Sequence, residues 1–185
     1  MNQLQSTVKL VFSSPIKRSL RGLHRNFVFH RALKQFIRNP GACANPTEPI
    51  LNDLIYGWGN ESWSALNEYL ACCIQHSLVM NGPILECGSG LSTILGGIIA
   101  KKRGQIYWAL EHKSDWAAKV QRYLNKYKID SVVLCEKLLK DYGTFCWYNP
   151  PLKSMPGNFA LVICDGPPAS TKGGRYGLGR NAFLS

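Results

Sequence analysis

Residues 84–93 read Ile-Leu-Glu-Cys-Gly-Ser-Gly-Leu-Ser-Thr, and this stretch decides the fold that the sequence predicts. Two apolar residues lead to an acid, a Gly-x-Gly turn follows, and the next residues can begin a helix. A strand that passes through a glycine turn into a helix is typical of sites for nucleotide-bearing ligands. The residues around the turn have to distinguish a dinucleotide from an adenosine that carries a sulfonium group.

Strand and helix patterns alternate from residue 83 onward. The predicted strands span residues 83–87, 105–111, 130–135 and 159–165, and the predicted helices span residues 91–102 and 114–126, the second capped by Ser114. The near-continuous apolar run at 159–165 predicts a strand that is covered on both faces. This alternation predicts an α/β fold with a doubly wound parallel sheet.

The N-terminal region predicts a basic amphipathic helix over residues 16–37. Its apolar residues recur at helical spacing at 16, 20, 23 and 27, and a slightly rotated face continues at 29, 33, 36 and 37. Basic residues lie between them. Such a helix can pack on its own domain with a solvated basic face, lie on an anionic membrane surface over residues 16–38, or contact nucleic acid.

Residues 39–80 predict a linker and a second helical region. Asn39-Pro40-Gly41 ends the first helix, residues 39–49 predict a linker, and residues 49–80 predict helix with a break near Gly57. The aromatic side chains around this break can form a lid or substrate wall, or can belong to the core; they are Tyr56, Trp58 and Trp63. We therefore expect a helical arm at 1–40, a lid or linker region at 41–80 and a ligand-binding domain at 81–185.

The positive charge is concentrated in the arm. The chain has 185 residues and a net charge of +11, and residues 1–40 hold eight Lys or Arg and no Asp or Glu. The other 145 residues have 14 basic and 11 acidic side chains, so they contribute only +3. Any electrostatic partner of this protein should therefore bind mainly to the arm.

The composition also predicts a cytoplasmic protein whose cysteine thiols are reduced. No apolar run approaches the ~18–20 residues that cross a bilayer, and the N-terminus lacks the pattern of a secretory signal. Seven cysteines are scattered without a Cys-x-x-Cys pair, so we expect reduced, mostly buried thiols. The four histidines have no ligand spacing to a cysteine pair, and we expect no metal site.

Three acids follow or end predicted strands, namely Glu86, Glu111 and Asp165. In open parallel sheets, ligands bind outside the carboxyl ends of the strands. A dinucleotide would need a third glycine where Thr93 stands, and Glu86 would bring a negative charge toward its pyrophosphate. A carboxylate near the turn suits an ammonium or sulfonium group instead, while Glu111 is spaced to accept ribose hydroxyls in either case. These residues favour S-adenosylmethionine.

The sequence resembles the class I S-adenosylmethionine-dependent methyltransferases over roughly residues 80–180, a family with a Rossmann-like sheet. The matching segments are Glu-Cys-Gly-Ser-Gly-Leu-Ser-Thr at 86–93, Ala-Leu-Glu-His at 109–112 and Leu-Val-Ile-Cys-Asp-Gly-Pro-Pro at 161–168. The resemblance implies methyl transfer to an O or N nucleophile of an unidentified acceptor. It places Asp165 near the methyl group, where we expect this catalytic candidate to orient the nucleophile or act as a base. It assigns cofactor binding to Glu86, Gly88, Gly90, Ser92, Thr93, Glu111 and His112.

The sequence departs from this family at its C-terminal end. Three further strands normally follow the strand that ends at Asp165, whereas only 20 residues follow it here. We therefore expect a truncated methyltransferase that lacks its last strands and exposes part of its apolar sheet. A non-catalytic scaffold that binds a cofactor or a partner is the alternative function.

Two further motifs add alternatives. Asn149-Pro150-Pro151 resembles a motif of methyltransferases that act on adenine amino groups, which would make nucleic acid the substrate; its position before the last strand favours a turn. Arg175 and Tyr176 lie in a glycine-rich loop that can close over a substrate or remain solvated, and Lys172 beside it can meet an anionic group.

Overall fold

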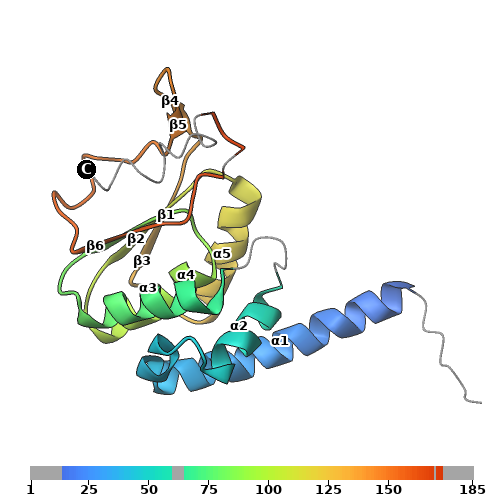
Figure 1. Cartoon of the computed structure of the whole chain (residues 1–185). Coiled ribbons are helices and arrows are strands. Elements are labelled where there is room, and N and C mark those ends of the chain that lie inside the picture. The colour runs from blue at the N-terminus through green and yellow to red at the C-terminus, as the bar shows by residue number, and fades with distance from the viewer. Residues whose placement is uncertain (1–13, 60–64, 169, 173–185) are drawn as a thin grey trace, which may run out of the picture.

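The N-terminal part of the molecule is helical. The computed structural model describes residues 14–59, 65–168 and 170–172, with side-chain environments from residue 19 onward. Its first elements are α1 (Ser14–Arg38), the 3-10 helix η1 (Pro40–Ala44), α2 (Pro49–Trp58) and α3 (Asn67–Val79). α1 and α2 lie together below the sheet in Figure 1, and they approach so closely that a Cβ at Gly57 would lie 2.6 Å from Cβ of Phe29.

A four-stranded parallel sheet forms the centre of the fold. Its strands are β1 (Ile84–Cys87), β2 (Tyr107–Glu111), β3 (Val132–Glu136) and β6 (Leu161–Cys164), in the order β3-β2-β1-β6. α4 (Leu91–Lys102) connects β1 to β2, and α5 (Ser114–Lys126) connects β2 to β3. The prediction of a Rossmann-like α/β fold with an N-terminal helical region is thus confirmed, because each parallel pair is joined through a helix or a long connection.

One face of the sheet packs against helices. Ile84 and Tyr107, which are register partners in β1 and β2, form an apolar cluster with Ala100 of α4 and with Tyr69 and Cys73 of α3. A larger cluster joins residues of all five α-helices and η1 in one core. The C-terminal half of α1 therefore packs into the same core as the helices that cover the sheet.

An element that the sequence did not predict lies at the carboxyl edge of the sheet. A two-stranded antiparallel hairpin, β4 (Lys140–Asp141) and β5 (Cys146–Trp147), follows β3 and lies above the sheet in Figure 1. Together with Tyr148 it covers the carboxyl ends of the strands. The expectation that the last strand is covered on both faces is wrong, because Val162 of β6 is 42% exposed among the described residues.

Residues 39–49 are not a simple linker. η1 lies within them, contacts α3, and buries Pro40 and Cys43. The proline at its first position restricts the backbone locally, and the apolar cysteine side chain extends the core. The sequence pattern missed this element because one short turn has no measurable periodicity.

The two apolar faces predicted on α1 behave differently. Phe29, Leu33 and Phe36 are buried, whereas Leu20, Leu23 and Phe27 are exposed. The prediction of an apolar face that rotates only slightly is therefore wrong: among residues 19–38, whose side chains the structure describes, the buried apolar side chains lie in the C-terminal half of α1.

Two smaller predictions also need correction. The residue before α5 is Lys113, which makes no side-chain capping bond, so Ser114 is the first helical residue and not the cap. All seven cysteines are free as expected, but only Cys43 and Cys87 are buried, and Cys72 is exposed.

In the described part of the chain, no helix combines the length and apolar composition needed to cross a bilayer.

Candidate functional site

A cleft lies at the carboxyl edge of the sheet. Its volume is about 280 Å³, and it is lined by Gly88, Ser89, Glu111, His112, Lys113, Trp116, Tyr148, Asp165, Gly166 and Pro168. These residues come from the loop after β1, the end of β2 and the start of α5, the segment after β5, and the loop after β6. The topology places them together because β1 lies between β2 and β6 in the sheet.

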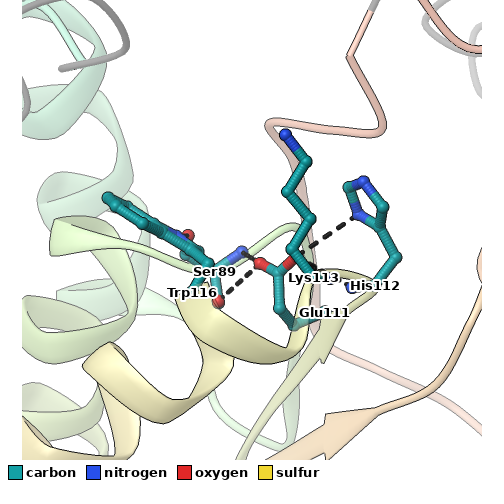
Figure 2. Close-up of polar contacts among 5 residues, drawn as sticks. All are labelled: Ser89, Glu111, His112, Lys113 and Trp116. Carbon is teal, nitrogen blue, oxygen red and sulfur yellow. Dashed lines mark hydrogen bonds and ion pairs between the residues drawn. The ribbon is translucent and has the colours of Figure 1, made fainter.

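Glu111 accepts four hydrogen bonds at the carboxyl edge of the sheet. Its Oε2 accepts hydrogen bonds from the backbone N–H of Ser89 at 3.2 Å and from the Ser89 hydroxyl at 2.7 Å. Its Oε1 accepts from the backbone N–H groups of His112 at 2.8 Å and Lys113 at 2.9 Å. Figure 2 shows the carboxylate between Ser89 and His112. Four donors occupy the four acceptor positions of a carboxylate, so Glu111 is fully satisfied although it is only 3% exposed.

The glycine loop uses its own backbone donors. The N–H of Gly88 donates to the carbonyl oxygen of Leu110 at 3.0 Å, and the N–H of Gly90 donates to Oγ1 of Thr93 at 2.9 Å. Since Ser89 N–H donates to Glu111, all three loop N–H groups have partners within the chain. A glycine turn that binds pyrophosphate leaves such groups free for the phosphate oxygens.

The absence of a side chain has a different structural consequence at Gly88 and at Gly90. Gly88 has φ +106°, and a Cβ there would lie 3.3 Å from the backbone nitrogen of Gly166. Glycine is thus required at 88 by the fold itself. Gly90 has an extended φ, and a Cβ at this position would meet nothing within 4 Å. Gly90 therefore leaves open space beside the loop.

Glu86 lies beneath the loop and does not line the cleft. It is fully buried and accepts hydrogen bonds from the hydroxyls of Ser92 and Thr93, the latter at 2.5 Å. Burial raises the pKa of Glu86 to about 7, against the effect of these hydrogen bonds. The chain of bonds from Glu86 through Thr93 to Gly90 connects the end of β1 to the first turn of α4 and supports the loop.

An aromatic and cationic cluster holds α2 beside the loop. The indole N–H of Trp116 donates to the carbonyl oxygen of Ser89 at 2.5 Å, and Figure 2 shows this ring alongside Ser89. Nζ of Lys119 lies 4.2 Å from the ring centroid of Trp58 and 4.4 Å from that of Trp116, and it donates to the Trp58 carbonyl oxygen at 3.1 Å. Burial lowers the pKa of Lys119 to about 8. These contacts position the C-terminal end of α2 near the cleft.

Asp165 lies exposed at the opposite wall of the cleft. Its backbone N–H donates to the carbonyl oxygen of Cys87 at 2.9 Å, which extends the pairing of β6 with β1. It lines both the main cleft and an adjoining smaller hollow that is bordered by Trp58 and Gly90. Asp165 is followed by Gly166, whose peptide bond to Pro167 is cis.

Tyr148 and His112 form the side of the cleft next to the hairpin segment. Their rings meet edge to face with centroids 5.9 Å apart, and Tyr148 is buried. A Cβ at Gly166 would collide with the Tyr148 hydroxyl, so glycine is needed there for close packing. Nδ1 of His112 lies 3.3 Å from Oε1 of Glu111, yet burial lowers the pKa of His112 below its ordinary value. Burial therefore favours the neutral form of this imidazole.

The structure brings some of the predicted residues together and separates others. Gly88, Glu111, His112 and Asp165 line the main cleft, Gly90, Ser92 and Trp58 line the adjoining hollow, and Glu86 and Thr93 lie beneath the loop. Tyr56 points toward α1, where its hydroxyl lies 2.9 Å from Nδ1 of His24. Trp63, Arg175 and Tyr176 lie outside the described residues.

Two of the remaining sequence motifs lie away from the cleft. Asn149 is exposed, and residues 149–151 form an irregular segment, so the turn that the sequence predicts at these residues begins one residue later, at Leu152. Nζ of Lys172 lies 2.9 Å from Oδ2 of Asp141 at the hairpin. Neither Asn149 nor Lys172 belongs to the lining of the cleft.

Sequence reasoning missed several residues of the cleft. Ser89 could have been selected because it stands between the two glycines, and Trp116 because it follows Glu111 within the first turn of the next helix. Tyr148 had no such signal, since its segment reaches the cleft only through the packing of the hairpin on the sheet.

The described residues contain no group of three or more His, Cys, Asp or Glu side chains placed to hold a metal ion. Comparison with known proteins found no matching family model, no matching curated protein and no matching solved structure. The chemistry of the cleft therefore has to be judged from its own residues.

Proposed function

We propose that this protein binds S-adenosylmethionine in the cleft and transfers its methyl group to an O or N nucleophile of an acceptor. The observation that carries this proposal is the arrangement of Glu111 and Asp165 on two sides of the Gly88–Gly90 loop in one cleft. In this arrangement a ligand with an adenosine at one end and a sulfonium-bearing chain at the other would place its ribose at Glu111 and its methyl group on the side of Asp165.

Glu111 is proposed to bind the ribose. Its Oε2 accepts a bond from the rotatable hydroxyl of Ser89, and a ribose hydroxyl can replace that donor without breaking a backbone bond. The three backbone N–H groups on Glu111 would keep the carboxylate in place during this exchange. The imidazole of His112 and the indole of Trp116 supply flat surfaces beside Glu111 on which an adenine could stack.

The glycine loop supports this ligand over a dinucleotide. The N–H groups of Gly88, Ser89 and Gly90 all donate within the chain, so the loop offers a pyrophosphate none of these three donors. The sequence argument from the charge of Glu86 does not contribute, because this carboxylate is buried beneath the loop. The open space at Gly90 suits the close approach of an uncharged or cationic chain.

Asp165 is proposed to orient the acceptor. It is exposed and lines both the main cleft and the hollow beside Trp58, whose volume is about 30 Å³, so a single hydroxyl or amine of an acceptor that reaches this hollow would meet its carboxylate. Bound S-adenosylmethionine supplies an already activated methyl group, and the protein needs mainly to position the nucleophile and exclude water. Asp165 can accept the proton of a hydroxyl or amine that it contacts.

The first test is a thermal melt of the full chain with S-adenosylhomocysteine and, separately, with NADH. We expect S-adenosylhomocysteine to raise the midpoint temperature of unfolding in proportion to the logarithm of its concentration. NADH should leave this temperature unchanged. Release of S-adenosylhomocysteine from the methyl donor across a panel of acceptors then tests transfer. Stabilisation by NADH alone would contradict the proposed ligand, and binding without turnover would favour the non-catalytic scaffold.

A further inference from the structure

One face of α1 carries a continuous solvent-exposed stripe. Its six positions recur at spacings of three, four, four, three and four residues, which places them on one side of an α-helix. All six side chains are exposed: Leu20, Leu23, Phe27, Arg31, Lys34 and Arg38. We call the first three the apolar half and the last three the basic half of the stripe.

The apolar side chains of the apolar half do not pack into the core of the described fold. Leu20, Leu23 and Phe27 are 50%, 64% and 66% exposed, whereas Phe29 and Leu33, about half a turn away around the helix, are buried. A helix that packs through one face normally exposes polar residues on the opposite face. The N-terminal part of α1 also extends beyond the rest of the described fold in Figure 1, so this surface is open to a partner.

The charge around the stripe selects the kind of partner. Residues 1–40 contain eight Lys or Arg and no Asp or Glu, so the stripe has no negative charge on its own helix. An apolar strip continued by cations fits a boundary between hydrocarbon and anionic headgroups, where both halves are satisfied at once. Nucleic acid would use the cations but would leave the apolar half exposed to water.

A second copy of the chain fits the stripe less well. Two α1 helices paired in parallel along the whole stripe would place the cations of one on the cations of the other. Paired antiparallel, they would place Leu20–Phe27 of each against Arg31–Arg38 of the other. Neither arrangement buries apolar surface against apolar surface without repulsion or desolvation of charge.

We propose that the stripe on α1 is a docking surface for anionic membranes, with Leu20, Leu23 and Phe27 inserted between the lipids and Arg31, Lys34 and Arg38 at the headgroups. This docking does not depend on the proposed cofactor, since the stripe and the cleft share no residue. The exposed stripe of α1 would hold the protein at the bilayer, while the opposite face of the C-terminal half of α1 packs into the core and connects the helix to the fold.

The test is flotation of the full chain with vesicles of phosphatidylcholine alone and of an equimolar mixture with phosphatidylglycerol. We expect binding to the anionic vesicles only, and weaker binding as the salt concentration rises. Replacing the basic half by Arg31→Gln, Lys34→Gln and Arg38→Gln should reduce the affinity about 100-fold, at about fivefold for each charge. The triple variant Leu20→Ser, Leu23→Ser and Phe27→Ser should reduce it at least about tenfold.

Two matched variants control for general loss of charge or apolar surface. The first removes three exposed cations elsewhere through Lys102→Gln, Lys137→Gln and Lys153→Gln. The second removes three exposed apolar side chains through Ile106→Ser, Leu138→Ser and Leu152→Ser. Both should retain most of the binding, and circular dichroism melts should show that all four variants fold, since every replaced side chain is exposed.

Three results would overturn the proposal. The first is a full chain that does not float with anionic vesicles, and the second is an equal loss of binding in the stripe variants and their matched controls. The third is a concentration-dependent dimer in sedimentation that the apolar-half variant abolishes while vesicle binding is unchanged. That last result would identify the stripe as an interface between copies of the chain.

Discussion

Glu86 and Glu111 are two buried carboxylates near the ends of neighbouring strands, and the fold uses them in different ways. In the register of β1 and β2, Glu86 pairs with Ala109, and Glu111 stands two residues further along β2. Both side chains thus lie on the same face, separated along the strand direction by about 7 Å. Glu86 meets the hydroxyls of the first turn of α4, whereas Glu111 meets the glycine loop and the cleft.

This difference shows that the position of an acid along the pleat decides its role. Glu86 lies two residues before the carboxyl edge of the sheet, where its carboxylate is buried and supports the glycine loop. This burial raises the pKa of Glu86 to about 7. Glu111 lies at the carboxyl edge of the sheet, where its carboxylate accepts hydrogen bonds from three backbone N–H groups and lines the cleft. Ligand binding and fold stability should therefore respond separately to changes at the two residues.

The largest expected effect is on ligand binding at Glu111. Glu111→Ala removes the proposed bond from a ribose hydroxyl to a charged acceptor, and we expect a loss of about 3 kcal/mol, or roughly 150-fold in affinity. Isothermal titration with S-adenosylhomocysteine measures it. Glu136→Ala is the matched control, because exposed Glu136 is the register partner of Glu111 on β3 and does not line the cleft. Equal affinities in the two variants would remove the ribose assignment.

Because Glu111→Ala also leaves three N–H groups without their acceptor, its fold has to be checked. A cooperative melt without ligand shows whether the variant folds. Glu111→Gln retains the shape of the side chain and one acceptor oxygen, so it should fold and bind with an intermediate affinity. If Glu111→Gln binds as the unchanged chain does, the charge of Glu111 does not contribute to recognition.

The second effect concerns stability at Glu86. A carboxyl whose pKa rises from 4.5 to about 7 on folding binds more protons in the folded state, so its contribution to stability decreases as the pH rises through this range. Relative to Glu86→Gln, the unchanged chain should lose about 3 kcal/mol of unfolding free energy between pH 4.5 and pH 8. Urea titrations of both proteins at each pH measure this difference, in which titrations elsewhere cancel. A difference that does not vary with pH would contradict the buried, raised-pKa carboxyl.

The smallest effect distinguishes the two serines that bond to these acids. Ser89→Ala removes the hydroxyl that a ribose hydroxyl is proposed to replace, so affinity for S-adenosylhomocysteine should remain unchanged or rise by about threefold, less than 1 kcal/mol. Ser92→Ala removes a donor to Glu86 and should lower stability by about 1 kcal/mol with little change in affinity. A tenfold loss of affinity in Ser89→Ala would show that its hydroxyl contacts the ligand.

The order of elements in the sheet domain could be predicted from the sequence. The predicted helices 91–102 and 114–126 have the bounds of α4 and α5, and all four predicted strands are present. These elements follow from local apolar patterns of adequate length, and the right-handed parallel connections then restrict the topology. The strands of the hairpin have two residues each and are too short for a pattern, so they were missed.

The site could be predicted only in part. Glu111 and Asp165 were found because strand ends of a parallel sheet meet at one edge, and this rule needs no knowledge of side-chain packing. The position of Glu86 beneath the loop depends on contacts with α4 that no local pattern contains. The same holds for Tyr148, which enters the cleft through the packing of the hairpin segment.

The sequence by itself determined the strand–glycine–helix corner, the alternation that makes a parallel sheet, and the concentration of positive charge in α1. These properties belong to short segments, whose residue types and spacing restrict the backbone directly. The tertiary structure decided which acid faces the cleft, which half of α1 is buried and which side chains complete the site. Those properties depend on contacts between segments far apart in the chain, and only the packed fold brings such segments within bonding distance.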